Sequence, residues 1–156
     1  MPAPLPSPIR DRLAAVERET GVVLGEVIRQ TDKTLLAGGE LDHRPVVVRL
    51  LLDGDEYWRQ KLAHEVAVYR AFTTYPPPVR VPHLVFADDT SVLILSRLDG
   101  QPLGEERYAV GPLAPRKVDA VLAAVRALNA WRPPPRTFGP CSTTRNASSA
   151  TTPAAS

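Results

Sequence analysis

The sequence has 156 residues, of which 44% are hydrophobic and 23% charged, and its formal net charge is +2. This length and composition predict one globular domain with a hydrophobic core, and the chain is short for two domains. Basic residues are scattered among acidic ones, so no clustered basic face for nucleic acid is expected. Because no apolar run approaches a membrane span and no secretion signal is visible, the sequence predicts a cytoplasmic protein.

The cysteine and histidine content argues against a metal cluster. A single cysteine, Cys141, excludes an intrachain disulfide and any cysteine-based cluster. The three histidines, His43, His64 and His83, lie far apart without the spacing of metal ligands. The sequence therefore predicts no metal site.

The first quarter of the chain predicts a helix followed by three strands. Ser7 and Pro8 are typical of a helix start, with the Ser7 hydroxyl as the cap, and Gly21 is a typical stop. Three strand-like runs follow at residues 22–29, 34–36 (with an extension toward residue 40) and 45–52. The polar segments between them, at 30–33 and 38–44, favour an antiparallel meander.

The remaining elements predict an α+β fold. Asp53 and Asp55 offer caps for a long amphipathic helix over residues 56–72, which the proline run after Tyr75 ends. Two more strands are expected at 81–86 and 91–95, and a further helix at 115–131. From about residue 139 the chain is rich in Ser, Thr, Ala and Pro without apolar periodicity, which predicts a disordered tail.

Two charged residues stand where apolar ones are expected. Arg49 is the one charged residue in an otherwise apolar run from residue 46 to 52. Glu65 falls in the middle of the apolar stripe of the helix that follows. The stripe consists of Trp58, Leu62, Val66, Tyr69 and Phe72. A charge on a packing face is costly unless an opposite charge meets it, and arginine binds carboxylate bidentately. Each residue alone is more often exposed, but together they predict an ion pair.

These elements and residues resemble the N-terminal lobe of the protein-kinase-like fold, in its aminoglycoside and choline phosphotransferase branch. The resemblance rests on LAHEVAVYRAF, SVLILSRLDGQPL and VDAVLAAVRALNAW, and covers residues 20 to 138. It implies an N-terminal helix and leader at 1–21 and a kinase-like lobe at 22–103, with a five-stranded antiparallel sheet and a packed helix. A partial helical second lobe would follow at 104–138, with the tail at 139–156.

The family binds ATP, and the resemblance implies where this chain would do so. A basic residue on the third strand, here Arg49, holds the α- and β-phosphates and pairs with a glutamate on the next helix. The backbone after the fifth strand holds the adenine edge, and the first turn lies near the phosphates, although the glycine-rich pattern is absent. The implied nucleotide-binding residues are Arg49, Glu65, Ser96, Arg97, Leu98, Thr31 and Lys33.

The catalytic loop of the family is missing. Relatives carry a histidine-glycine-aspartate stretch, a downstream asparagine and a second aspartate that holds magnesium, and nothing after Leu103 contains such a stretch. Phosphoryl transfer needs metal ions and an aspartate that orients the nucleophile. No catalytic or magnesium-binding residue is therefore assigned, no turnover is expected, and the acceptor alcohol cannot be named.

Three interpretations stay open. The chain is a truncated or frame-shifted, inactive member of the family, a non-catalytic module that binds nucleotide or protein, or an unrelated small α+β domain with Arg49 and Glu65 on its surface. The expected partner is a nucleotide, with neither nucleic acid nor membrane. The apolar face of the helix at 115–131 would lack a cover, which favours self-association.

Overall fold

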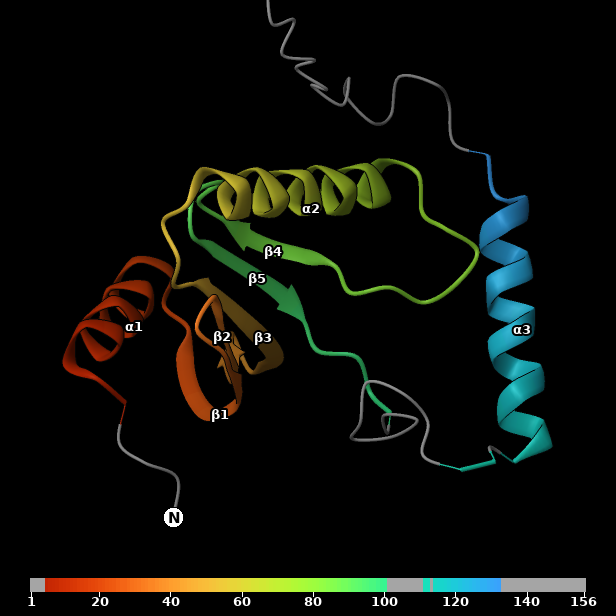
Figure 1. Cartoon of the computed structure of the whole chain (residues 1–156), viewed down its shortest axis with the longest axis horizontal. Helices are drawn as coiled ribbons and strands as arrows, with labels where there is room; N and C mark the ends of the chain where they lie inside the picture. Colours follow the sequence, from red (N-terminus) through yellow and green to blue (C-terminus); the bar gives the residue numbers. More distant parts are fainter. Residues whose placement is uncertain (1–4, 101–110, 113, 133–156) are drawn as a thin grey trace, which may run out of the picture.

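The computed structural model describes residues 5–100, 111–112 and 114–132. Within this range the chain is α+β, with a five-stranded antiparallel sheet and packed helices, which confirms the predicted fold class (Figure 1). The predicted disordered tail, Cys141 and parts of the predicted second lobe lie outside the described residues.

The order of elements agrees with the predicted one. The elements are α1 (Ser7–Thr20), β1 (Val23–Gln30), β2 (Thr34–Leu41), β3 (Arg44–Leu51), α2 (Glu56–Thr74), β4 (Leu84–Ala87), β5 (Val92–Ser96) and α3 (Pro115–Ala130). The strand order in the sheet is β1-β2-β3-β5-β4, and every neighbouring pair is antiparallel. The strand that carries Arg49 is therefore central. None of the described helices is long and apolar enough to cross a membrane.

The start of α1 differs from the prediction. Pro6 occupies the N-cap position and Ser7 already lies in the first turn, so its hydroxyl does not cap the helix. The Pro6 carbonyl accepts hydrogen bonds from the amides of Ile9 and Arg10 at 3.0 and 3.1 Å, and the Ser7 hydroxyl accepts one from the Arg10 guanidinium at 2.9 Å. The predicted stop is confirmed, because Gly21 adopts a left-handed conformation with φ 75°.

The hairpin between β2 and β3 is tighter than predicted. Instead of a polar segment from residue 38 to 44, the turn consists of Asp42 and His43, which have φ values of 50° and 59°. Two residues with positive φ match the twist of the flanking strands, so the pairing continues up to the turn. Gly39 thus lies inside β2, where a Cβ atom would stand 2.9 Å from the Val23 carbonyl oxygen. Because Gly39 has no side chain, β1 can approach β2 closely at this point.

The fourth strand is shorter than predicted, since β4 begins at Leu84 and not at residue 81. Pro82 has no amide hydrogen to donate to a neighbouring strand, which delays regular pairing. The chain before β4 is still fixed to the sheet, because the Ser96 amide donates to the His83 carbonyl at 2.9 Å.

The two faces of the sheet carry separate apolar clusters. Successive side chains of a strand point to opposite faces. Leu13 and Val16 of α1 join the first cluster, and Leu62 and Val66 of α2 join the second. The strand residues of the first are Val22, Leu35, Ala37, Val46, Val48, Leu50, Val92 and Ile94, the first of which directly precedes β1. The second contains Leu51 and Leu93 from the strands, and α2 runs alongside β4 and β5 (Figure 1).

In contrast to the other helices, α3 has no buried residue and stands apart from the sheet (Figure 1). Its apolar side chains are 38–46% exposed. They are Val118, Val121, Leu122, Val125 and Leu128. The helix is connected to the rest of the fold at its end, where the rings of Trp131 and Phe72 meet edge to face with centroids 5.7 Å apart.

Candidate functional site

The predicted ion pair is present. Arg49 alternates along β3 with Val48 and Leu50, which face α1, so its side chain faces α2. Glu65 lies on α2 between Leu62 and Val66, which are 1% and 0% exposed. The Arg49 guanidinium Nη1 donates to the Glu65 carboxylate Oε2. The two side chains retain 25% and 32% of their exposure, so water and a ligand can both reach the pair.

Tyr69 lies one turn after Glu65 on α2, and the charges of the ion pair affect the pKa of its phenol. Burial raises the pKa of the Tyr69 phenol, the nearby Glu65 carboxylate raises it further, and Arg49 lowers it. The phenol therefore lies close to both charges. A guanidinium carries five N–H donors, and Glu65 engages one nitrogen of Arg49. Donors of Arg49 remain for an anion that approaches from the open side.

An apolar surface extends from Arg49 toward β1 and β2. We call it the open strip. Its side chains are those of Ile28, Leu36 and Val47, and Gly38, which is itself buried, lies beside the Ile28 and Arg97 side chains. Leu36 pairs with Arg49 and Gly38 with Val47, so these side chains share the face of Arg49. The Ile28 side chain reaches within 3.9 Å of the position of a Cβ on Gly38 and is on this face too. The cluster beneath α2 includes no member of the strip, and Ile28 is 49% exposed.

Arg97 marks the other end of the open strip. Its guanidinium Nη1 lies 3.6 Å from where a Cβ on Gly38 would be, and its amide donates to the Pro45 carbonyl at 2.9 Å. Gly38 pairs with Val47, which is two residues or roughly 7 Å from Arg49 along β3. No carboxylate among the described residues pairs with the Arg97 side chain. The strip is therefore bounded by one paired and one unpaired guanidinium.

The segment from Ser96 to Leu98 offers fewer donors than its sequence suggested. The Ser96 amide donates to His83 and the Arg97 amide to Pro45, both at 2.9 Å. Within the described ranges the Leu98 amide has no partner. This segment also borders a hollow of about 500 Å³, together with the end of α2 and the chain before β4. Of the three amides, that of Leu98 is the one available to a ligand.

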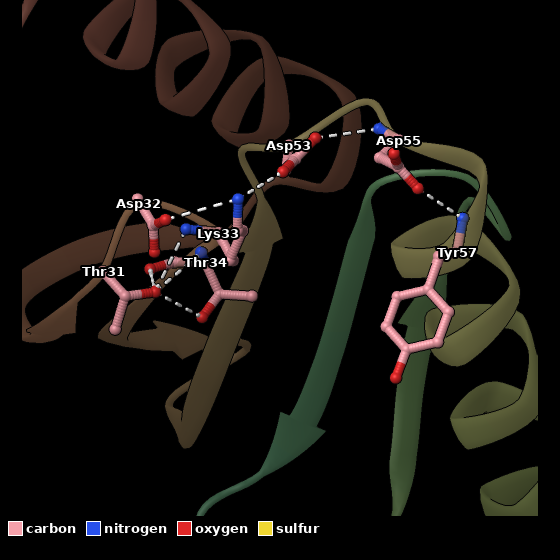
Figure 2. Close-up of polar contacts among 7 residues, drawn as sticks. All are labelled: Thr31, Asp32, Lys33, Thr34, Asp53, Asp55 and Tyr57. Carbon is pink, nitrogen blue, oxygen red and sulfur yellow. Dashed lines mark hydrogen bonds and ion pairs between the residues drawn. The ribbon is translucent and has the colours of Figure 1, made fainter.

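Thr31 is engaged within its own turn, and Lys33 is engaged both with that turn and with the junction between β3 and α2 (Figure 2). The Thr31 hydroxyl accepts hydrogen bonds from the amides of Lys33 and Thr34 at 3.2 and 3.0 Å. The Lys33 ammonium pairs with Asp53 at 2.8 Å and with Asp32 at 3.3 Å. The structure thus brings Arg49 and Glu65 together, whereas Thr31 and Lys33 make no hydrogen bond or ion pair with them. Their predicted contact with phosphate stays a prediction.

Sequence reasoning did not identify the open strip, the position of the Arg97 guanidinium or the pairing of Lys33 with Asp53. Val47 and Arg49 are two residues apart on β3 and therefore share a face, which was a sequence signal for the strip. The other residues of the strip can be placed only once the register between β1, β2 and β3 is known. The cap was foreseen in part, since Asp55 accepts from the Tyr57 amide at 2.7 Å. No sequence signal joins Lys33 to a carboxylate that lies 20 positions further along the chain.

A metal centre does not emerge from the described part of the chain, where no group of three or more His, Cys, Asp or Glu residues could hold an ion. Neither a scan against protein-family models nor a search of curated proteins finds a match to this sequence.

Proposed function

We propose that this chain is the nucleotide-binding lobe of an aminoglycoside-phosphotransferase-like, kinase-like protein, and that it binds ATP without transferring a phosphoryl group. The observation that carries the proposal is the ion pair between Arg49, on the central strand, and Glu65, on the helix that follows. The pair lies at one end of an apolar surface that no described helix covers.

The phosphates of ATP would lie at the Arg49 end of the open strip. Glu65 holds the guanidinium in one orientation, which lowers the entropy that Arg49 loses when a ligand binds. The remaining N–H donors of Arg49 match the geometry of phosphate oxygens. Glu65 also balances the charge of Arg49 when the site is empty, so that a partly buried cation is not left without a counter-charge.

The base would lie on the open strip, toward Leu98. Binding sites for small molecules combine apolar walls with a few convergent polar groups. Leu36 and Val47 supply an apolar surface for the flat face of a purine, and the Leu98 amide supplies a donor for its edge. The strip extends from Arg49 to Val47 along β3, roughly 7 Å, and continues across β2 toward β1 through Leu36, Gly38 and Ile28.

The proposal stops at binding. The sequence contains no histidine-glycine-aspartate stretch, and the described residues offer no group of metal ligands. Magnesium, which the family uses, therefore has no fitting ligand set among them, and we derive no step through it. A cytoplasmic location, where ATP is abundant, belongs to the same proposal.

Calorimetric titration of the full chain with ATP tests the proposal. We expect Arg49→Ala to weaken binding about tenfold or more, because a charge-assisted hydrogen bond is lost, and Glu65→Gln to weaken it less. Arg59→Ala is the matched control, since Arg59 lies on α2 with a side chain 51% exposed and pairs with Glu56 at 3.5 Å. It should leave the affinity unchanged. If wild-type protein does not bind ATP, or if Arg49→Ala binds it equally well, the proposal is wrong.

Two further titrations separate the ends of the proposed site. Adenosine should bind independently of Arg49, because it carries no phosphate, whereas inorganic triphosphate should bind weakly and lose that binding in Arg49→Ala. A phosphotransferase assay with ATP should show no turnover. Transfer to any alcohol would contradict the second half of the proposal and leave the first intact.

A further inference from the structure

The turn between β1 and β2 is fixed to the junction between β3 and α2 by one residue, Lys33 (Figure 2). Its carbonyl oxygen accepts hydrogen bonds from the amides of Leu52 and Asp53 at 2.8 and 3.4 Å. Its ammonium reaches the same place from the side-chain end and contacts the Asp53 carboxylate Oδ2 at 2.8 Å. Main chain and side chain of Lys33 therefore both hold the residues that lead into α2.

Asp53 passes this restraint on to the helix. Its second carboxylate oxygen, Oδ1, accepts from the Asp55 amide at 2.9 Å. Asp55 is the N-cap residue, and its side chain accepts from the Tyr57 amide at 2.7 Å. The contacts thus form an unbroken series from the turn to the first turn of α2. Because a helix is a stiff element of fixed rise, the placement of its start also sets the placement of Glu65 further along.

The charges of Lys33 and Asp53 reinforce each other. Hydrogen bonding to Asp53 and then to Asp32 raises the pKa of the Lys33 ammonium. Hydrogen bonding to Lys33, followed by that from the Asp55 amide, lowers the pKa of the Asp53 carboxyl. Both groups are therefore charged across the neutral range. A phosphate that recruited Lys33 would have to displace two carboxylates.

We infer that Lys33 and Asp53 are positioning residues that hold the first turn of α2 so that Glu65 meets Arg49, and that Lys33 is not a phosphate ligand. These contacts involve only residues of this chain, but one arm of the test rests on the proposed function. The two roles of Lys33 lead to opposite expectations for Asp53, which makes them separable.

The ATP arm compares Lys33→Met, Asp53→Asn and the double variant by calorimetry. A phosphate ligand freed from its carboxylate would bind ATP more tightly, so Asp53→Asn would then increase the affinity. Positioning residues instead predict that both single variants weaken binding by a similar, about two- to fivefold factor, the range of an exposed ion pair. The double variant should be no weaker than either single one, since both remove the same contact. Lys33→Arg should restore the affinity. Tighter binding in Asp53→Asn would overturn the inference.

The second arm needs no nucleotide. Hydrogen exchange of the amides in the first turn of α2 should be about two- to fivefold faster in Lys33→Met and Asp53→Asn, and the NMR signals of the Arg49 guanidinium should shift in both. Asp32→Asn is the matched control, because Asp32 contacts the same ammonium but, among the described residues, makes no hydrogen bond or ion pair with the junction. It should change neither readout. Unchanged exchange and unchanged Arg49 signals would overturn the inference, whereas absent ATP binding in wild type would refute only the proposed function.

Discussion

The two faces of the sheet are built from the same strands and differ in how deeply their side chains are buried. On the face toward α1, Val48, Leu50 and Ile94 are 0%, 1% and 0% exposed, and apolar packing closes the surface. On the face toward α2, the neighbouring residues Val47 and Arg49 stay half-buried. The face toward α1 is therefore closed along β3. The face toward α2 is closed beneath the helix by Leu51, Leu62, Val66 and Leu93 but keeps a charged pair and an apolar surface accessible beside it. The comparison shows that a single strand can serve both purposes through its alternation.

The largest effect is expected from shortening one side chain on the closed face. Val48→Ala should lower the free energy of unfolding by about 2–3 kcal/mol, because it removes two buried methyl groups and leaves a cavity. Val47→Ala, the same change one residue away, should cost about 1 kcal/mol or less, since Val47 is already in contact with solvent. Urea denaturation of the pair measures the difference. Equal losses for the two variants would contradict the division into a closed and an open face.

Asp88 lies in the turn between β4 and β5 and offers a test of stability outside both faces of the sheet. Burial acts to raise the pKa of its carboxyl, but hydrogen bonds from the amides of Ser91, Val92 and Thr90 and from the Ser91 hydroxyl outweigh it, and the pKa is lowered from 3.8. Asp88→Ala should cost about 1–3 kcal/mol, as expected when donors lose their acceptor.

The sign of the pH dependence follows from that lowered pKa. The stabilisation by Asp88 is complete above the ordinary carboxyl pKa and is lost as the pH falls through the lower folded-state value. Denaturation at a series of acidic pH values should show wild type losing more stability than Asp88→Ala. Parallel curves for the two proteins would show that Asp88 does not titrate differently on folding.

The ion pair tests whether the open face contributes to stability. Arg49→Met should cost about 1–2 kcal/mol, because Glu65 is left without its partner, although water that reaches the site limits the loss. The double variant Arg49→Met with Glu65→Leu should recover most of it, since an apolar pair of similar size suits the surroundings. Failure of the second substitution to compensate would show that the two side chains act independently.

The smallest change in stability is expected on α3. None of its residues is buried, whereas both faces of the sheet carry buried apolar clusters. We expect wild-type protein to self-associate at high concentration through this face. Val125→Glu should reduce the association seen by sedimentation equilibrium and alter unfolding by less than about 0.5 kcal/mol, as is usual at exposed positions. Lys117→Gln, also on α3, is the charge-matched control, because it too changes the net charge by −1. A monomeric wild type would refute this expectation.

Much of the fold was predictable because strong local patterns coincide with strong physical requirements. The long helix at α2 combines apolar periodicity with a cap at Asp55 and a proline run at its end. The pairing of Arg49 with Glu65 was predictable because each charge interrupts an apolar pattern, and each such interruption requires a partner. Arg49 and Glu65 are each the partner that the other requires.

The rest depends on contacts that no local pattern encodes. The Ser7 cap was wrong because Pro6 already supplies the carbonyl that starts α1. The turn at Asp42 and His43 was overestimated in length, since the glycines at 38 and 39 looked like a loop. Both lie inside β2, and Gly39 allows the close approach of β1. The contact of Lys33 with phosphate stays a prediction, whereas its pairing with Asp53 could not be predicted because it depends on where the chain returns after β3.

The close approach at Gly39 has a consequence for sequence comparison. A methyl group at this position would collide with the carbonyl oxygen of Val23 on the neighbouring strand, a main-chain atom that cannot rotate away as a side chain can. By contrast, a Cβ on Gly54 would meet nothing within 4 Å. In a saturation library, or in an alignment of homologues, we therefore expect position 39 to stay glycine while position 54 varies. A glycine kept at position 39 would then indicate the same close pairing of β1 with β2, even in sequences with little other similarity.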